Sequence, residues 1–118
     1  MCRRKSEPYL GLLNFPGGKA EPGEEGLAAA YRELYEETSL SRGNLRGPLL
    51  HLLDFSYPTD GIKVEVYAGR LAGEADLKEE KHPLLWVLLD GTDFFDTKTF
   101  AGEGNIGHII LHMAMKGI

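Results

Sequence analysis

The glutamates of the segment RELYEET, Arg32 to Thr38, are the residues whose types and spacing most directly suggest chemistry. On a helix, Glu33, Glu36 and Glu37 stand at positions i, i+3 and i+4, so their carboxylates fall within an arc of about 100°. Like charges at this spacing repel one another by about 0.2–0.5 kcal/mol per pair. A divalent hard cation would turn that repulsion into binding energy, and Mg²⁺ favours a few carboxylates together with waters and substrate phosphates.

A solvated helical surface is the simpler interpretation of such a face when it stands alone. The residues upstream of this helix favour a functional role for the glutamates instead. Gly18 is followed after five residues by Glu24, and after seven more by Arg32 and Glu33. Glycine and charged residues held at fixed spacing over so long a stretch are far more specific than a lone glycine-rich loop.

The stretch Gly18–Leu40 resembles the signature of the Nudix hydrolase family. That signature reads Gly, five residues, Glu, seven residues, Arg-Glu, an apolar residue, any residue, Glu-Glu, any residue, Gly and an apolar residue. The sequence GKAEPGEEGLAAAYRELYEETSL matches every fixed position except one, because Ser39 stands where the family has glycine. A residue just past a helix often adopts positive φ, which costs a serine about 1 kcal/mol. We therefore expect Ser39 to lower the stability of the helix end slightly without affecting the candidate catalytic residues.

The resemblance implies a metal site on the predicted helix. Glu36 and Glu37 are its implied ligands, and Glu33 is either a further ligand or the base that activates water. Gly18 lets the backbone approach a ligand closely, and its main-chain carbonyl is a further candidate for the ligand set. The implied cofactor is Mg²⁺, with Mn²⁺ as a substitute.

The resemblance also implies two supporting roles. Glu24, near the helix start, interacts favourably with the helix dipole and pairs with Arg32, which locks the loop against the helix. The pattern NFPGGK (Asn14–Lys19) looks most like the MutT branch of the family, in which an acidic residue three positions before a proline approaches the metals. Glu80 in the segment EKHP is the matching residue, with its neighbour Glu79 and a plain solvated loop as alternatives.

Four polar residues are candidates for contacts with a nucleotide. Lys19 is placed to meet a phosphate, with a solvated loop lysine as an equal alternative. Asn14 and Asn105 carry amides that suit the edge of a purine, although a helix cap is the simpler role for Asn105. Asp90 lies at the end of a predicted strand, where a carboxylate can face a base. The histidines show no spacing with cysteine or acids that indicates zinc, and they are interpreted as ordinary polar residues: His51, His82, His108 and His112.

The elements that must position these residues follow from the hydrophobic periodicity. The apolar run Tyr9–Phe15 predicts a buried strand, which a Pro-Gly-Gly breaker ends. Leu27, Tyr31 and Leu34 recur at helical spacing, with an alanine and a tyrosine widening the stripe. They predict an amphipathic helix from about Glu24 to Thr38.

Later segments predict a hairpin, a strand and a second helix. Leu49–Tyr57 and Ile62–Leu71 are typical of two strands joined by the turn YPTDG. The apolar run Leu84–Asp90 predicts a further buried strand, with Trp86 in the core rather than serving as a stacking platform. Apolar residues on one helical face predict a C-terminal helix from about Asn105 to Lys116.

Strands interleaved with two helices indicate an α/β or α+β domain. The resemblance implies a Nudix-type mixed β-sheet sandwiched between helices. Family members generally have a strand before the segment equivalent to Tyr9–Phe15, and here only about eight residues precede it. We therefore expect a sheet that lacks its usual N-terminal strand, or a partner chain that covers the edge, which makes a homodimer an expectation.

Length and composition limit the class of protein. The 118 residues suit a single domain spanning 1–118, and 42% apolar and 26% charged residues are ordinary for a globular domain. The net charge of -5 argues against a nucleic-acid polymer as partner. The one cysteine, Cys2, forms no internal disulfide, and no stretch approaches the roughly 20 apolar residues of a membrane span. We expect a cytoplasmic protein with no membrane partner.

The resemblance implies a Mg²⁺-dependent pyrophosphohydrolase of MutT-like type. Its substrates would be (deoxy)nucleoside triphosphates, including oxidised purine forms such as 8-oxo-dGTP, and its products a monophosphate and pyrophosphate. ADP-ribose or a nucleotide-sugar is the alternative substrate within the enzyme class. A nucleotide-binding module that has lost catalysis is the alternative outside that class.

Overall fold

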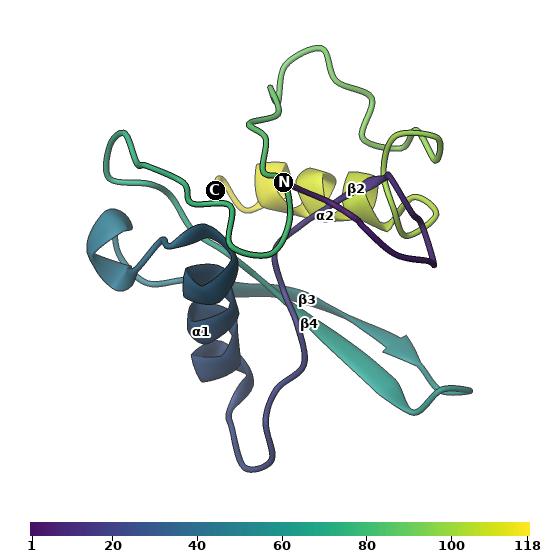
Figure 1. The fold of residues 1–118 in the computed structure, drawn as a ribbon, viewed down its shortest axis with the longest axis horizontal. Coiled ribbons are helices and arrows are strands. Elements are labelled where there is room, and N and C mark those ends of the chain that lie inside the picture. The colour runs from purple at the N-terminus through teal and green to yellow at the C-terminus, as the bar shows by residue number, and fades with distance from the viewer.

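Four strands and two α-helices make up the fold in the computed structural model, which describes residues 1–118 (Figure 1). Along the chain these are β1 (Cys2–Arg3), β2 (Leu13–Asn14), α1 (Gly26–Thr38), a 3₁₀ turn (Arg42–Asn44), β3 (Leu50–Tyr57), β4 (Ile62–Ala68) and α2 (Asn105–Met115). The α+β class expected from the sequence is confirmed.

Helix α1 ends at the residue predicted and begins two residues later than predicted. Its C-terminus is closed by Ser39 in the left-handed conformation with φ 66°, whose N–H donates to the carbonyl of Tyr35 at 2.8 Å. The serine therefore accepts the conformation that a glycine adopts more easily. The strain lies at the helix end, as the sequence predicted.

The buried face of α1 differs from the predicted apolar stripe. Leu27 and Tyr35 are 37% and 58% exposed, whereas Glu33 and Glu37 are buried together with Ala29. Buried carboxylates are rare unless they are paired or hydrogen-bonded. Two candidate functional side chains of α1, Glu33 and Glu37, are therefore buried, so each needs an ion-pair or hydrogen-bond partner.

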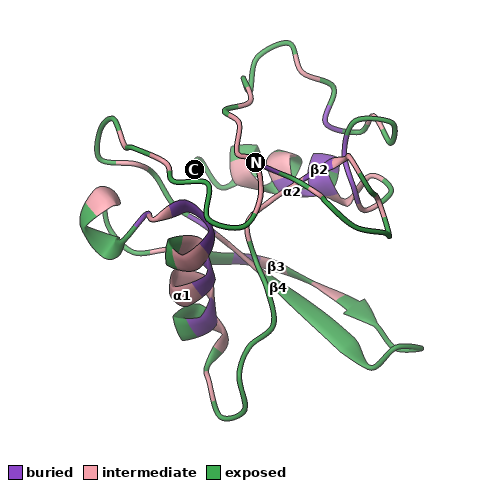
Figure 2. Cartoon of the chain, viewed as in Figure 1, coloured by how far each residue is buried: buried purple, intermediate pink, exposed green.

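Strands β3 and β4 form the predicted hairpin. Tyr57 pairs with Ile62 across the turn and Phe55 pairs with Val64, and a bulge interrupts the register between His51 and Leu53. Helix α1 contacts β4, and α2 contacts β3, so the helices flank the hairpin. The hairpin tip projects away from the rest of the chain, and it is exposed along most of its length (Figures 1 and 2).

The N-terminal strands differ from the prediction. The run Tyr9–Phe15 forms a strand only at Leu13–Asn14, because Tyr9 and Gly11 adopt positive φ in a turn. Cys2 pairs with Asn14 in antiparallel register, so the residues before the turn do supply a short N-terminal strand. The strands form two separate antiparallel pairs rather than one mixed sheet. Parallel pairing is limited to an isolated bridge between Leu13 and Phe100.

The predicted strand at Leu84–Asp90 does not form. Leu84 makes a bridge to Cys2 and Leu85 exchanges backbone hydrogen bonds with Met1, but the pairing does not extend beyond Leu85. Trp86 is 67% exposed, so its predicted place in the core is wrong. Its neighbours Leu85 and Val87 instead pack against the core. A continuous apolar run does not specify which side is buried, because it lacks the alternation that does so in a strand.

The main core lies beside β2 and under α2. It contains Leu13, Phe94, Phe100 and Ile106, and partly buried side chains pack around these four. Helix α2 was predicted to within one residue of its end. A Cβ at Gly107 would overlap the ring of Phe95, so only glycine allows this close contact. Neither helix is long and apolar enough to cross a membrane.

Candidate active site

Arg32 is the centre of a charged cluster on α1. Its Nε and Nη2 atoms each donate to a carboxylate oxygen of Glu24 at 2.9 Å, a bidentate pair that was predicted. Nη2 also donates to the carbonyl of Lys19 at 2.9 Å, which ties the glycine-rich loop, residues 16–19, to the helix. These bonds hold the pKa of Glu24 down to about 2 and raise the pKa of Arg32. The guanidinium is therefore a fixed positive charge.

Two of the three predicted carboxylates converge on that charge. Nη1 of Arg32 lies 2.8 Å from Oε1 of Glu33 and 3.2 Å from Oε2 of Glu36. The Nζ atom of Lys81 lies 3.5 Å from the same oxygen of Glu36. Arg32 and Lys81 therefore offset part of the repulsion expected between these two glutamates.

The backbone of Gly18 lies directly against this cluster. A Cβ at Gly18 would overlap the carboxylate of Glu33. Any larger residue would have to displace that side chain, so the close approach requires glycine. The structure therefore brings Gly18, Glu33, Glu36 and Arg32 together.

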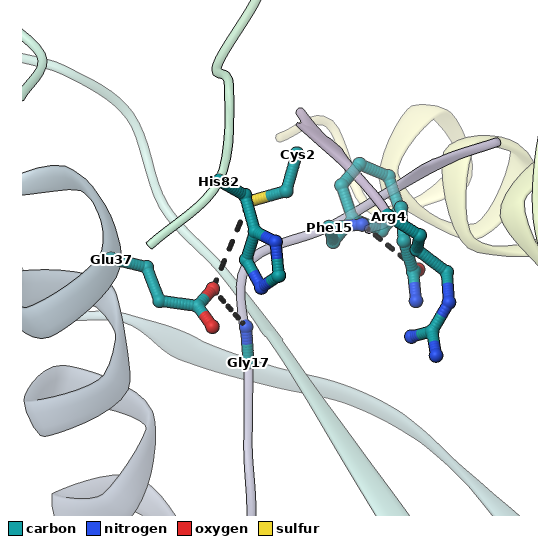
Figure 3. A pocket seen from close by; sticks show the side chains of 7 residues that line it. Cys2, Arg4, Phe15, Gly17, Glu37 and His82 are labelled. Carbon is teal, nitrogen blue, oxygen red and sulfur yellow. Dashed lines mark hydrogen bonds between the residues drawn. The ribbon is translucent and has the colours of Figure 1, made fainter. Parts of the chain in front are cut away.

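Glu37 points to a different place. It is buried, and its Oε2 accepts hydrogen bonds from the N–H of Gly17 at 3.0 Å and from Sγ of Cys2 at 3.7 Å (Figure 3). The carboxylate oxygens of Glu33, Glu36 and Glu37 do not come within 4.8 Å of one another as a set. Helical spacing places the three side chains on neighbouring arcs, but partners from other segments decide where each carboxylate turns.

The donor set of this region fits a hard divalent cation. Carboxylates and a main-chain carbonyl are oxygen ligands of the kind that Mg²⁺ and Mn²⁺ take. Glu33 and Glu36 both accept hydrogen bonds from Nη1 of Arg32, so the two carboxylates lie close together. Of the predicted ligand residues, the structure brings Gly18, Glu33 and Glu36 together, whereas Glu37 is turned towards Gly17 and Cys2.

A cavity of about 80 Å³ opens beside Glu37. Its lining comes from β1, β2, the glycine-rich loop, α1 and the loop before Pro83: Cys2, Arg4, Asn14, Phe15, Gly17, Glu37 and His82 (Figure 3). The cavity contains the predicted substrate residue Asn14. It was not predicted that Arg4 and His82 would meet there, because neither carries a local sequence signal that connects it to the helix.

The remaining predicted residues lie apart from this cluster. Lys19, Glu80 and Asp90 are exposed, and no ion pair or hydrogen bond joins their side chains to the other candidates. Asn105 donates from Nδ2 to the hydroxyl of Tyr57 at 2.8 Å. Its simpler predicted role as a helix cap is wrong, because Gly104 occupies that position.

The hairpin carries a second group of side chains that can bind a metal. The ligand atoms of His51, Asp54 and Glu65 all lie within 4.8 Å of one another on the exposed surface. Nε2 of His51 lies 2.7 Å from Oδ1 of Asp54, and this contact lowers the pKa of Asp54. The bulge after His51 brings these two side chains to one face, a detail that sequence spacing does not contain.

Comparison with known proteins gives one family. A family model described as the NUDIX domain matches residues 1–103. No curated protein and no solved structure matches the chain. Nudix enzymes act on nucleotide-derived substrates and generally use divalent metals. The matched region contains the whole Arg32 cluster and the cavity beside Glu37. The chain belongs to the Nudix family of hydrolases, which cleave phosphoric anhydride bonds.

Proposed function

We propose that this protein is a Mg²⁺-dependent pyrophosphohydrolase of MutT-like type. Its substrates are (deoxy)nucleoside triphosphates, including oxidised purine forms such as 8-oxo-dGTP, and its products are a nucleoside monophosphate and pyrophosphate. The observation that carries this proposal is the convergence of Glu33 and Glu36 on Arg32 against the backbone of Gly18. This oxygen-rich cluster is joined by a small cavity beside Glu37 and Gly17, which has the amide of Asn14 in its wall.

The metal's contribution is general to this chemistry. A bound Mg²⁺ stabilises the charge that develops on the phosphate oxygens and lowers the pKa of an attacking water. The chain would hold the ion through carboxylates and the carbonyl of Gly18. Glu36 and Glu37 are proposed as ligands and Glu33 as a ligand or the general base.

The side chains of this protein supply orientation and proton transfer. Arg32 orients the carboxylate of Glu33 through a 2.8 Å hydrogen bond, which supports the proposed role of that carboxylate in accepting a proton from the attacking water. Glu24 in turn fixes Arg32 by two bonds at 2.9 Å. Lys81, 3.5 Å from Glu36, is a cation that a triphosphate would meet at the rim of the cluster.

The cavity supports a nucleotide substrate, because its wall contains the amide of Asn14, which suits the edge of a purine. ADP-ribose and nucleotide-sugars differ from a nucleoside triphosphate in the group beyond the pyrophosphate, and the assay panel separates these substrate classes.

A pyrophosphate-release assay over a nucleotide panel tests the proposal. The panel contains the four deoxynucleoside triphosphates, 8-oxo-dGTP, ATP and ADP-ribose, each with Mg²⁺ and with EDTA. We expect pyrophosphate and a monophosphate from at least one triphosphate, and no product with EDTA. Release of AMP from ADP-ribose alone would favour the alternative substrate class. No turnover of any nucleotide by a folded sample would favour the binding module.

A further inference from the structure

The register of the β3–β4 hairpin places two carboxylates side by side. Asp54 and Glu65 pair directly across the two strands, so their side chains leave the same face of the hairpin. Like charges in this position destabilise a strand pair. Lys63 offsets part of this repulsion at the surface, with its Nζ atom 3.5 Å from Oδ2 of Asp54. A divalent cation bound by both carboxylates would turn the remaining repulsion into attraction.

His51 adds an imidazole nitrogen to these two carboxylates, a ligand that a solvated acidic patch lacks. The register shift between His51 and Leu53 brings its ring towards Asp54, and its Nε2 atom lies 2.7 Å from Oδ1 of that residue. One ligand atom from each of His51, Asp54 and Glu65 lies within 4.8 Å of the other two. In a four-coordinate Zn²⁺ site the ligand atoms are about 3.4 Å apart, because each bond is about 2.1 Å long. Small rotations of these three exposed side chains would therefore surround an ion.

Neighbouring residues hold two of the three side chains in place. The hydroxyl of Tyr67 donates to Oε1 of Glu65 at 3.3 Å, and the ring of Tyr67 meets the ring of His51 edge to face with centroids 5.4 Å apart. The other oxygen of Glu65, Oε2, lies against Gly26, the first residue of α1, where a Cβ would overlap it. Contacts from such supporting residues orient the ligands of metal sites. The group is thus built from β3, β4 and the start of α1.

We propose that His51, Asp54 and Glu65 form a second metal site, which binds Zn²⁺ or a similar transition metal and is separate from the carboxylates of α1. The imidazole sets this preference, because it suits Zn²⁺ and Ni²⁺, whereas Mg²⁺ takes oxygen ligands. Three protein ligands leave a fourth position for water. None of the three residues lies within Gly18–Leu40, so this site does not depend on the proposed function. A surface ion pair without affinity for metal is the competing explanation.

Calorimetric titration with ZnCl₂, in an excess of Mg²⁺ that occupies the α1 carboxylates, tests the proposal. We expect Zn²⁺ to bind the wild type, and His51→Ala and Glu65→Gln each to raise the Kd at least about tenfold. His112→Ala is the matched control, since His112 is an exposed histidine on α2. Glu36→Gln is the control for the α1 carboxylates, and both control variants should bind Zn²⁺ like the wild type. Thermal unfolding reports whether each variant keeps the fold.

NMR of the histidine rings identifies the ligand directly. The chain contains four histidines, and the ring signals of His51 are assigned by their loss in His51→Ala. We expect ZnCl₂ to shift the ring nitrogen signals of His51 first, because Nε2 faces Asp54 and becomes a metal ligand. The signals of the other three histidines should stay unchanged at the same Zn²⁺ concentration. MgCl₂ alone should leave the His51 signals where they are.

Several results would overturn the inference. No Zn²⁺ binding by the wild type, or equal affinities of the wild type and a folded His51→Ala, would leave only a surface ion pair. Loss of Zn²⁺ binding in Glu36→Gln would place the ion on α1, and unshifted His51 signals with Zn²⁺ bound would place it elsewhere. These readouts use no nucleotide, so a failure of the second metal site and a failure of nucleotide hydrolysis are distinguishable.

Discussion

At the scale of single residues, the buried carboxylate of Glu37 and its hydrogen-bond donors determine the state of the neighbouring Cys2 thiol. Glu37 accepts hydrogen bonds from the Gly17 N–H and the Cys2 thiol, which compensate in part for burying a carboxylate. Burial, and next to it the charge of Glu37, raises the pKa of the Cys2 thiol to about 11. The thiol is therefore kept protonated as a donor, and Cys2 acts as a small structural residue rather than a nucleophile.

This environment predicts that Cys2 is unreactive in the folded protein. With a pKa of about 11, roughly one thiol in a thousand is ionised at pH 8, and the thiolate is the reactive species. We expect the reaction of the native protein with DTNB at pH 8 to be at least tenfold slower than that of the same protein in urea. Equal rates in both conditions would show that Cys2 is neither buried nor perturbed.

The pair of Glu24 and Arg32 predicts a pH-dependent stability. The pKa of Glu24 falls from an ordinary value near 4.5 in the unfolded chain to about 2 in the folded one. The stabilisation by Glu24 is therefore fully present above pH 4.5 and is lost as the pH falls towards 2. In urea unfolding, Glu24→Gln should be less stable than the wild type at pH 7, and the difference should shrink at pH 2.5. A difference that is constant from pH 7 to pH 2.5 would contradict this account.

At the scale of elements, α1 and the glycine-rich loop act together. The helix provides Arg32, Glu33 and Glu36 from successive turns, and the loop closes over them because Arg32 bonds to the carbonyl of Lys19. The contact requires that residue 18 has no side chain. The loop and helix therefore form one structural unit, and we expect a substitution in the loop to displace the carboxylates on the helix.

Two glycine substitutions test this contact. Gly18→Ala adds a Cβ that overlaps the Glu33 carboxylate, whereas a Cβ at Gly17 meets nothing within 4 Å. We expect Gly18→Ala to lower kcat/KM for the preferred nucleotide by more than tenfold, a displacement effect of the size that small misplacements cause. Gly17→Ala should lose much less, and far-UV circular dichroism should show the helices intact in both. Equal losses for the two variants would remove the role of the Gly18 contact.

At the scale of the whole molecule, local patterns predicted the helices and the hairpin, and long-range pairing decided the rest. Helix α2 and the β3–β4 hairpin follow from periodicity and from the turn YPTDG, which act over a few residues. The segment Leu84–Asp90 depends on a partner strand, which its own residues do not specify, and only Leu84 and Leu85 pair with the N-terminal segment. For the same reason Trp86 is exposed although its neighbours are apolar.

The contacts of the candidate site that lie within one short stretch of sequence could be predicted. The family resemblance carried by Gly18–Leu40 implied the pairing of Arg32 with Glu24 and a place for Gly18 close to the carboxylates, and both contacts are present. It did not show that Glu37 turns towards Cys2, because that contact joins residues 35 positions apart. Lys81 and His82 reach α1 through the folding of a long loop, which no periodic signal describes.

The homodimer remains a prediction, and light scattering of the purified chain would test it.

The account's central claim is that the carboxylates of α1 hold a metal for nucleotide hydrolysis, and Glu37→Gln tests it most directly. The amide can still accept the Gly17 N–H while the buried charge is removed, so metal-free thermal stability should be unchanged or slightly raised. Pyrophosphate release from the best nucleotide with Mg²⁺ should fall by at least about 100-fold, because a metal ligand is lost. Full activity of Glu37→Gln, or a large loss of its metal-free stability together with the activity, would contradict the claim.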